Sequence, residues 1–190
     1  MGKNLLIIFC ILFMCCSTNV FKKGNRPHLN KDDDRILWSN KRKSVWDDFK
    51  GIPDSSSTNT VALTCYEISI TNNYLENDIP KYTLECYFIK SKSWTRVNDD
   101  YTLAHERLHF DIAELFTRKI RKAFDSLNVK KVKKVEIYND MYAFYGEKCD
   151  KYQNLYDNQV YFNDNQQLQW IKKVDVELAK LKKYEYIQEE

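Results

Sequence analysis

The chain has 190 residues, which is enough for one domain with a sizeable hydrophobic core. Its formal net charge is only +3, so the composition gives no reason to expect a nucleic-acid-binding protein. Aromatic residues make up 14% of the sequence, which argues against a largely disordered chain.

Residues 1–16 have the pattern of a bacterial lipoprotein signal peptide. Lys3 gives a positive start, and an uncharged apolar run extends from Leu5 to Met14. This run is too short to cross a bilayer as a helix, but it suits the core of a signal peptide. Cys15 and Cys16 follow directly, and either could carry the lipid. We therefore expect export and lipid anchoring in the cell envelope, on the periplasmic or cell-surface side. An ordinary cleaved signal peptide is the alternative.

Residues 17–35 are polar and charged, and they are predicted to form a flexible tether between the membrane and the folded domain. The first large apolar side chains follow at Ile36, Leu37 and Trp38. We therefore expect a single domain over residues 36–190. The sequence shows no internal repeat and no sign of a second domain.

Two segments, residues 61–70 and 82–90, are rich in β-branched and aromatic side chains and predict antiparallel strands. If the loop between them is centred between Thr71 and Pro80, the register sets Cys65 opposite Cys86. A disulfide between these two cysteines is then possible, and export would permit it. The alternative is two buried thiols on one face of the sheet.

The remaining chain predicts helices. From Tyr101 to about Leu127, apolar side chains recur every three or four residues, and residues 98–100 offer an N-cap. The same periodicity continues over residues 135–156 and again after Asp164. We therefore predict an α+β domain in which a small N-terminal antiparallel sheet is followed by about three helices.

The first predicted helix carries the motif His-Glu-x-x-His, formed by His105, Glu106 and His109. Because each helical residue turns about 100°, the two imidazoles lie one turn apart on the same face and can bind one Zn²⁺ ion. Glu106 lies beside that face, where it can act as a general base, as in zincin-like metallopeptidases. The alternative is a surface helix that carries two histidines by chance.

A catalytic zinc site usually has three protein ligands, so a third is needed. Asp111 and Glu114 are the nearest carboxylates, but they lie about 200° and 140° around the helix from His109. Both should point away from the site. The third ligand must then come from another segment.

Residues 88–94 and 103–114 resemble a bacterial secreted family of unknown function, whose members are assigned as zinc-dependent proteases from their motif. Residues 46–51 are similar to the opening motif of that family. The pair Tyr156-Asp157 and the region around Trp170 are similar to its closing segment. The resemblance covers roughly residues 36–182.

The resemblance implies that Asp157 is the third zinc ligand, with Glu147 and Asp164 as alternatives. There is one departure from the family pattern, which has a histidine a few residues after the Tyr-Asp pair. Residues 158–164 of this chain contain no histidine.

We therefore expect an envelope-tethered zinc peptidase that hydrolyses a peptide or protein substrate, with Glu106 as the general base. The alternative is a non-catalytic, lipid-anchored binding or structural protein with a degenerate metal site, and the missing histidine favours it. The sequence indicates no nucleic-acid partner and leaves the substrate and the oligomeric state open.

Overall fold

The computed structural model describes residues 33–57, 60–160 and 163–187. The predicted signal peptide, the lipidation expected at Cys15 or Cys16 and most of the predicted tether lie outside these residues. No helix in the described part of the chain is both long enough and apolar enough to cross a membrane.

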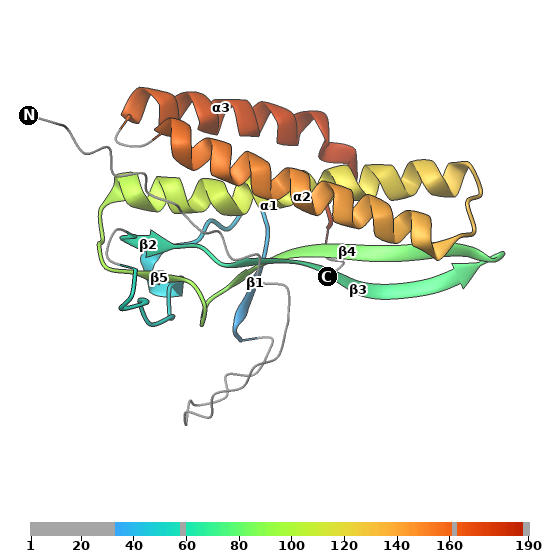
Figure 1. The fold of residues 1–190 in the computed structure, drawn as a ribbon, viewed down its shortest axis with the longest axis horizontal. Helices are drawn as coiled ribbons and strands as arrows, with labels where there is room; N and C mark the ends of the chain where they lie inside the picture. Colours follow the sequence, from blue (N-terminus) through green and yellow to red (C-terminus); the bar gives the residue numbers. More distant parts are fainter. Residues whose placement is uncertain (1–32, 58–59, 161–162, 188–190) are drawn as a thin grey trace, which may run out of the picture.

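The domain is α+β, as predicted, with three helices over one face of a small antiparallel sheet (Figure 1). The sheet has the strand order β1-β4-β3, and β2 and β5 form a separate antiparallel pair. The strands are β1 (Arg35–Leu37), β2 (Ala62–Leu63), β3 (Tyr66–Glu76), β4 (Ile79–Ile89) and β5 (Trp94–Thr95). The helices are α1 (Asp100–Val129), α2 (Val135–Val160) and α3 (Asp164–Lys180), with short 3₁₀ turns at Trp46–Asp48 and Lys182–Tyr184.

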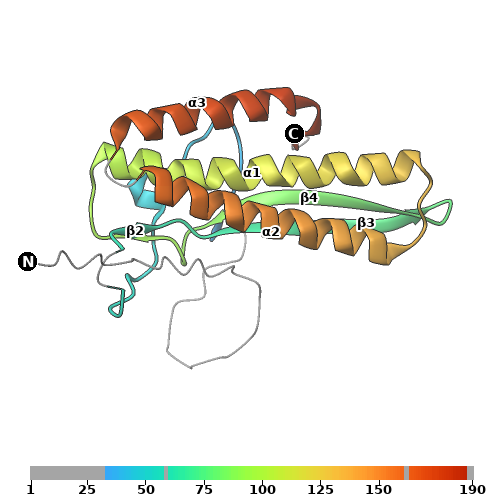
Figure 2. The same ribbon diagram turned by 45° about the horizontal axis from the view of Figure 1, so that its top comes forward.

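Helix α1 packs on β3 and β4, with α3 on its side away from the sheet (Figures 1 and 2). Helix α2 lies beside α1 and also reaches the sheet, where the Tyr142 hydroxyl donates to the Ile68 carbonyl of β3. Asp99 caps its start by accepting a hydrogen bond from the Thr102 amide at 2.8 Å. Because the helix is covered on several sides, Leu108, Ile112 and Leu115 are almost completely buried. The helix that carries the motif is thus the centre of the hydrophobic core.

The hairpin β3–β4 is longer than the sequence predicted, and its turn lies further along the chain. Asn77 and Asp78 form a two-residue turn with φ values of 52° and 63°. Asn and Asp tolerate this left-handed conformation, which a tight hairpin turn requires. The strands therefore continue through the segment that was expected to be a loop.

This turn position makes the predicted Cys65–Cys86 disulfide wrong. In the observed register, Cys86 lies opposite Ile68. Cys65 lies just before β3, where its carbonyl accepts a hydrogen bond from the Ile89 amide at 2.9 Å. The structure contains no disulfide between the two cysteines.

The folded domain also begins earlier than residue 36. Strand β1 starts at Arg35, and the carboxylate of Asp34 accepts hydrogen bonds from the amide and hydroxyl of Ser91 at 2.7 and 2.6 Å. Asp34 therefore belongs to the domain rather than to the tether.

Candidate metal centre

His105 and His109 lie one turn apart near the start of α1, and Asp157 faces them from the end of α2. The Nε2 atoms of the two histidines are 3.0 Å apart. Asp157 Oδ1 is 3.2 Å from His105 Nε2 and 2.9 Å from His109 Nε2. These three residues form a cluster that could hold a metal ion.

The spacing of the three donor atoms suits a small ion. Tetrahedral ligands with bonds of roughly 2.0–2.1 Å lie roughly 3.3 Å from one another. The observed separations of 2.9–3.2 Å are close to this value. Asp157 Oδ1 is also buried, and the two histidine Nε2 atoms are its nearest charged or polar neighbours among the described residues. A buried carboxylate oxygen beside two imidazole nitrogens fits a site for a cation.

Gln153 selects the tautomer that the neutral His109 ring adopts. Its amide nitrogen donates to the His109 carbonyl at 2.9 Å, so its oxygen Oε1 must be the atom that faces His109 Nδ1 at 2.7 Å. An oxygen at this position requires the hydrogen to be on Nδ1. The lone pair of the neutral ring is then on Nε2, which faces His105 and Asp157. Outer-shell partners of this kind orient the histidine ligands of metal sites.

Tyr156 supports both imidazole rings from α2. Its side chain is fully buried, and its ring stacks on that of His105 with centroids 4.7 Å apart. It also meets the His109 ring edge to face at 5.1 Å. Tyr156 therefore limits the rotation of both rings by packing.

Glu106 is buried beside the cluster, with 5% of its surface exposed. The oxygen Oε2 of its carboxylate has no hydrogen-bond partner among the described residues. Its charge acts on the cluster, because it contributes to raising the pKa of both His109 and Tyr156. Such an unpaired buried oxygen is costly unless it has a function or a bound solvent partner.

The electrostatic field at the cluster favours a positive charge. Burial lowers the pKa of His109, but the attraction of Asp157 and Glu106 outweighs it and raises the pKa to about 9. Burial also raises the pKa of Asp157, but the two histidines more than offset this and hold it well below its usual range. Two carboxylates and two imidazoles thus create a site in which a cation is stabilised.

The other carboxylates near the motif are used elsewhere, as their helical positions predicted. Asp111 accepts hydrogen bonds from Trp38 Nε1 at 2.7 Å and from Lys43 Nζ at 2.9 Å. Glu114 is buried, and its oxygen Oε1 accepts from Arg118 and Arg121 at 2.8 and 2.9 Å. Neither carboxylate belongs to the cluster.

The two alternative third ligands, Glu147 and Asp164, also lie outside the cluster. Glu147 is exposed on α2, almost three turns before Asp157 and therefore roughly 15 Å away along the helix axis. Asp164 is exposed in the first turn of α3. The structure thus places only Asp157, the first choice, beside the two histidines.

Sequence reasoning missed Gln153, although the sequence contains a signal for it. Cys149, Gln153, Tyr156 and Val160 follow one another at helical spacing and are all buried. A polar amide within such a stripe must find a buried partner, which marks it as part of a site.

Comparison with family models, curated proteins and solved structures found no match to this chain.

Proposed function

We propose that this chain is a zinc-dependent peptidase. One observation carries the proposal: two helices bring three donor atoms to within 3.2 Å of one another, beside a buried carboxylate oxygen of Glu106 that has no partner among the described residues. His105, His109 and Asp157 would hold the ion. Zinc supplies a Lewis acid that lowers the pKa of a coordinated water towards neutrality.

The order of the residues in the motif supports zinc. Two histidines and one carboxylate also bind iron(II) in oxygenases, so the ligand types alone do not select the metal. In zinc peptidases, however, a glutamate directly follows the first histidine and acts as the base. Glu106 occupies that position.

Glu106 and the histidines have distinct roles in this proposal. Glu106 would accept a proton from the attacking water and pass it to the leaving amine. Its unpaired oxygen is suited to this role, because no donor in the described part of the chain competes for it. Gln153 and Tyr156 would keep the two rings in position.

We also propose that the mature protein is exported and lipid-anchored at Cys15 or Cys16, facing the periplasm or the cell surface. The support is the apolar run from Leu5 to Met14 and the cysteines that follow it. Mass spectrometry of the N-terminal peptide from purified membranes tests this. We expect a lipid-modified cysteine at the N-terminus, and an unmodified N-terminus beyond Cys16 would contradict lipidation.

A second candidate is a metal site that stabilises the fold without catalysis. The limited access to the cluster favours it, because 22% of the His105 side chain and 10% of the His109 side chain are exposed. None of the three cluster residues lines the groove between α1 and α2 or the pocket that Lys43 and Asp175 line. The absence of a histidine in residues 158–164 points the same way.

Two substitutions separate the candidates. Glu106→Gln keeps the shape of the side chain but cannot accept a proton, so it should retain zinc and lose about 10²–10⁴-fold in peptide cleavage. Asp157→Asn weakens a ligand, so zinc content and cleavage should fall together. Zinc content and cleavage of a peptide library are measured on the same samples. Glu136→Gln, an exposed carboxylate-to-amide change on α2, is the control.

The outcomes are distinct. Cleavage by the parent that persists in Glu106→Gln would reject the mechanism. A parent that contains zinc but cleaves nothing would favour the structural metal site. Iron in place of zinc in the purified protein would contradict the peptidase assignment.

A further inference from the structure

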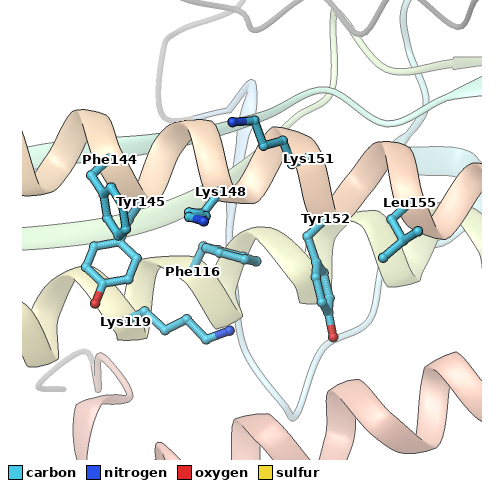
Figure 3. A pocket seen from close by; sticks show the side chains of 8 residues that line it. All are labelled: Phe116, Lys119, Phe144, Tyr145, Lys148, Lys151, Tyr152 and Leu155. Atoms are coloured by element: carbon cyan, nitrogen blue, oxygen red, sulfur yellow. The ribbon is translucent and has the colours of Figure 1, made fainter.

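A pocket with a volume of about 400 Å³ lies in the groove between α1 and α2 (Figure 3). Eight side chains line it, and three of them are Lys119, Lys148 and Lys151. The other lining side chains are aromatic or aliphatic. Among the described residues that line the pocket there is no carboxylate. The lining therefore combines apolar side chains with positive charge, and Glu177 of α3 pairs with one of the lysines, Lys119.

This pocket is separate from the metal centre. Lys148 and Leu155 lie roughly 180° and 200° around α2 from Asp157, so they are on the opposite face of the helix. None of the three metal-cluster residues lines the pocket. An inference about the pocket therefore does not depend on the proposed peptidase activity.

The apolar lining is partly open to solvent. Phe144 and Leu155 are 47% and 43% exposed and lie on the same side of α2, about three turns apart. Between them, Phe116 of α1 meets Tyr152 edge to face with ring centroids 5.5 Å apart. Phe116 is only 4% exposed, so the open apolar surface is provided by Phe144, Leu155 and the half-buried Tyr152. A flat apolar ligand would remove this surface from water.

The lysines place positive charge directly beside these rings. In Figure 3, Lys119 of α1 lies beside Phe116, and Lys148 and Lys151 extend from α2. The ammonium of Lys119 is 4.3 Å from the Phe116 ring centroid and 3.2 Å from Glu177 Oε2.

Lys148 is the lysine best placed for a ligand. Its ammonium lies 5.4 Å from the Phe144 ring centroid. In the described part of the chain, no carboxylate forms an ion pair with Lys148. Its charge is therefore not neutralised by the protein itself.

We propose that this pocket binds a small aromatic carboxylate. The ring of such a ligand would lie against Phe144 and Tyr152, and its carboxylate would lie beside Lys148. A lysine ammonium is a point charge that attracts a carboxylate without demanding one orientation. The pocket volume is at the lower end of the range for small-molecule sites, which suits a ligand of one or two rings.

Indole-3-acetate and tryptamine test the proposal, because they share one ring system and carry opposite charges. Titrations of the purified domain are followed by the amide NMR signals of α2. A binding free energy of about −0.3 kcal/mol per non-hydrogen atom is usual for small ligands. Indole-3-acetate should therefore bind with a Kd of about 1 mM. Tryptamine should bind at least about 10-fold more weakly, because its ammonium meets the lysines. The shifted signals should lie within residues 144–155.

The variant Lys148→Glu should weaken indole-3-acetate binding about 10-fold or more, because it reverses the nearest charge. Lys172→Glu makes the same charge change at an exposed position of α3 and should leave binding unchanged. Both variants are checked for native circular dichroism. Three results would each overturn the proposal: equal binding of tryptamine, an unchanged Kd in Lys148→Glu, or shifts centred on His105 and Asp157.

Discussion

Gln153 shows how a single residue outside the motif can determine the chemistry of the metal centre. It joins the ring and the main chain of His109 through one amide, with contacts of 2.7 and 2.9 Å. Because the amide has one oxygen and one nitrogen, its two contacts define which ring nitrogen of His109 carries the hydrogen. The remaining nitrogen, Nε2, is the one that faces Asp157 at 2.9 Å.

At the residue scale we predict that Gln153→Leu lowers zinc affinity by about 10–100-fold, as loss of an outer-shell partner does in other metal sites. Gln153→Glu should retain most of the affinity, because a carboxylate also accepts from His109 Nδ1. Competition with a chromogenic chelator measures the affinity, and Gln169→Leu, an exposed change on α3, is the control. Equal affinity of the parent and Gln153→Leu would contradict this role.

The site residues differ in how far the sequence could predict them. His105, Glu106 and His109 lie within five residues, so the geometry of one helix determines their relation. Gln153 meets His109 across a separation of 44 residues, which only the packing of α2 on α1 determines. Asp157 was predicted from the resemblance to a protease family and not from its spacing to the two histidines.

At the scale of elements, the β3–β4 hairpin shows why strand register could not be read from the sequence. The composition predicted both strands, but the register depends on which two residues form the turn. Asn77 and Asp78 adopt left-handed conformations there, with φ values of 52° and 63°. A second irregularity between Ile70 and Asn72 shifts the pairing again. An error of a few residues in the turn was enough to suggest a Cys65–Cys86 disulfide, which the observed register excludes.

We predict that Asp78→Val destabilises the domain by about 1–2 kcal/mol, because a β-branched residue is strained in the left-handed region. Asp78→Asn should change the stability by less than about 0.5 kcal/mol. It removes only the ion pair between Asp78 Oδ2 and Lys133 Nζ, which are 3.0 Å apart. This pair contributes little because the Lys133 side chain is 59% exposed and the Asp78 side chain 79% exposed. Urea unfolding measures both changes. If Asn costs as much as Val, the ion pair rather than the backbone determines the stability of the turn.

At the scale of the whole molecule, α1 connects all other parts of the domain. Its apolar side chains enter both buried clusters, one containing Ile112 and Trp170 and the other containing Phe124 and Tyr138. Periodicity predicted this helix and the fold class, because both follow from local pattern. The faces that α2 and α3 cover do not follow from local pattern. Lys43, Arg107 and Asp111, for example, line a pocket of about 220 Å³ with Ile171 and Asp175 of α3.

The metal centre joins the first turns of α1 to the last turns of α2, so an ion bound there should stabilise the whole domain. A ligand at 100 times its Kd stabilises the native state by about 2.7 kcal/mol if it does not bind the unfolded chain. For a domain of this size, that corresponds to a rise in Tm of roughly 5–10 °C. We therefore expect zinc to raise the Tm of the purified domain by this amount and a chelator to reverse the rise.

The double variant His105→Ala, His109→Ala should show no zinc-dependent rise in Tm, because Asp157 alone cannot hold the ion. Its own Tm should be lower than that of the metal-free parent, since Tyr156 loses the rings against which it packs at 4.7 and 5.1 Å. Calorimetric scans with and without zinc measure both effects on the same sample. The difference between the scans isolates metal binding from packing, because the packing loss is present in both. A zinc-dependent rise of equal size in the parent and the double variant would mean that the ion binds elsewhere in the chain.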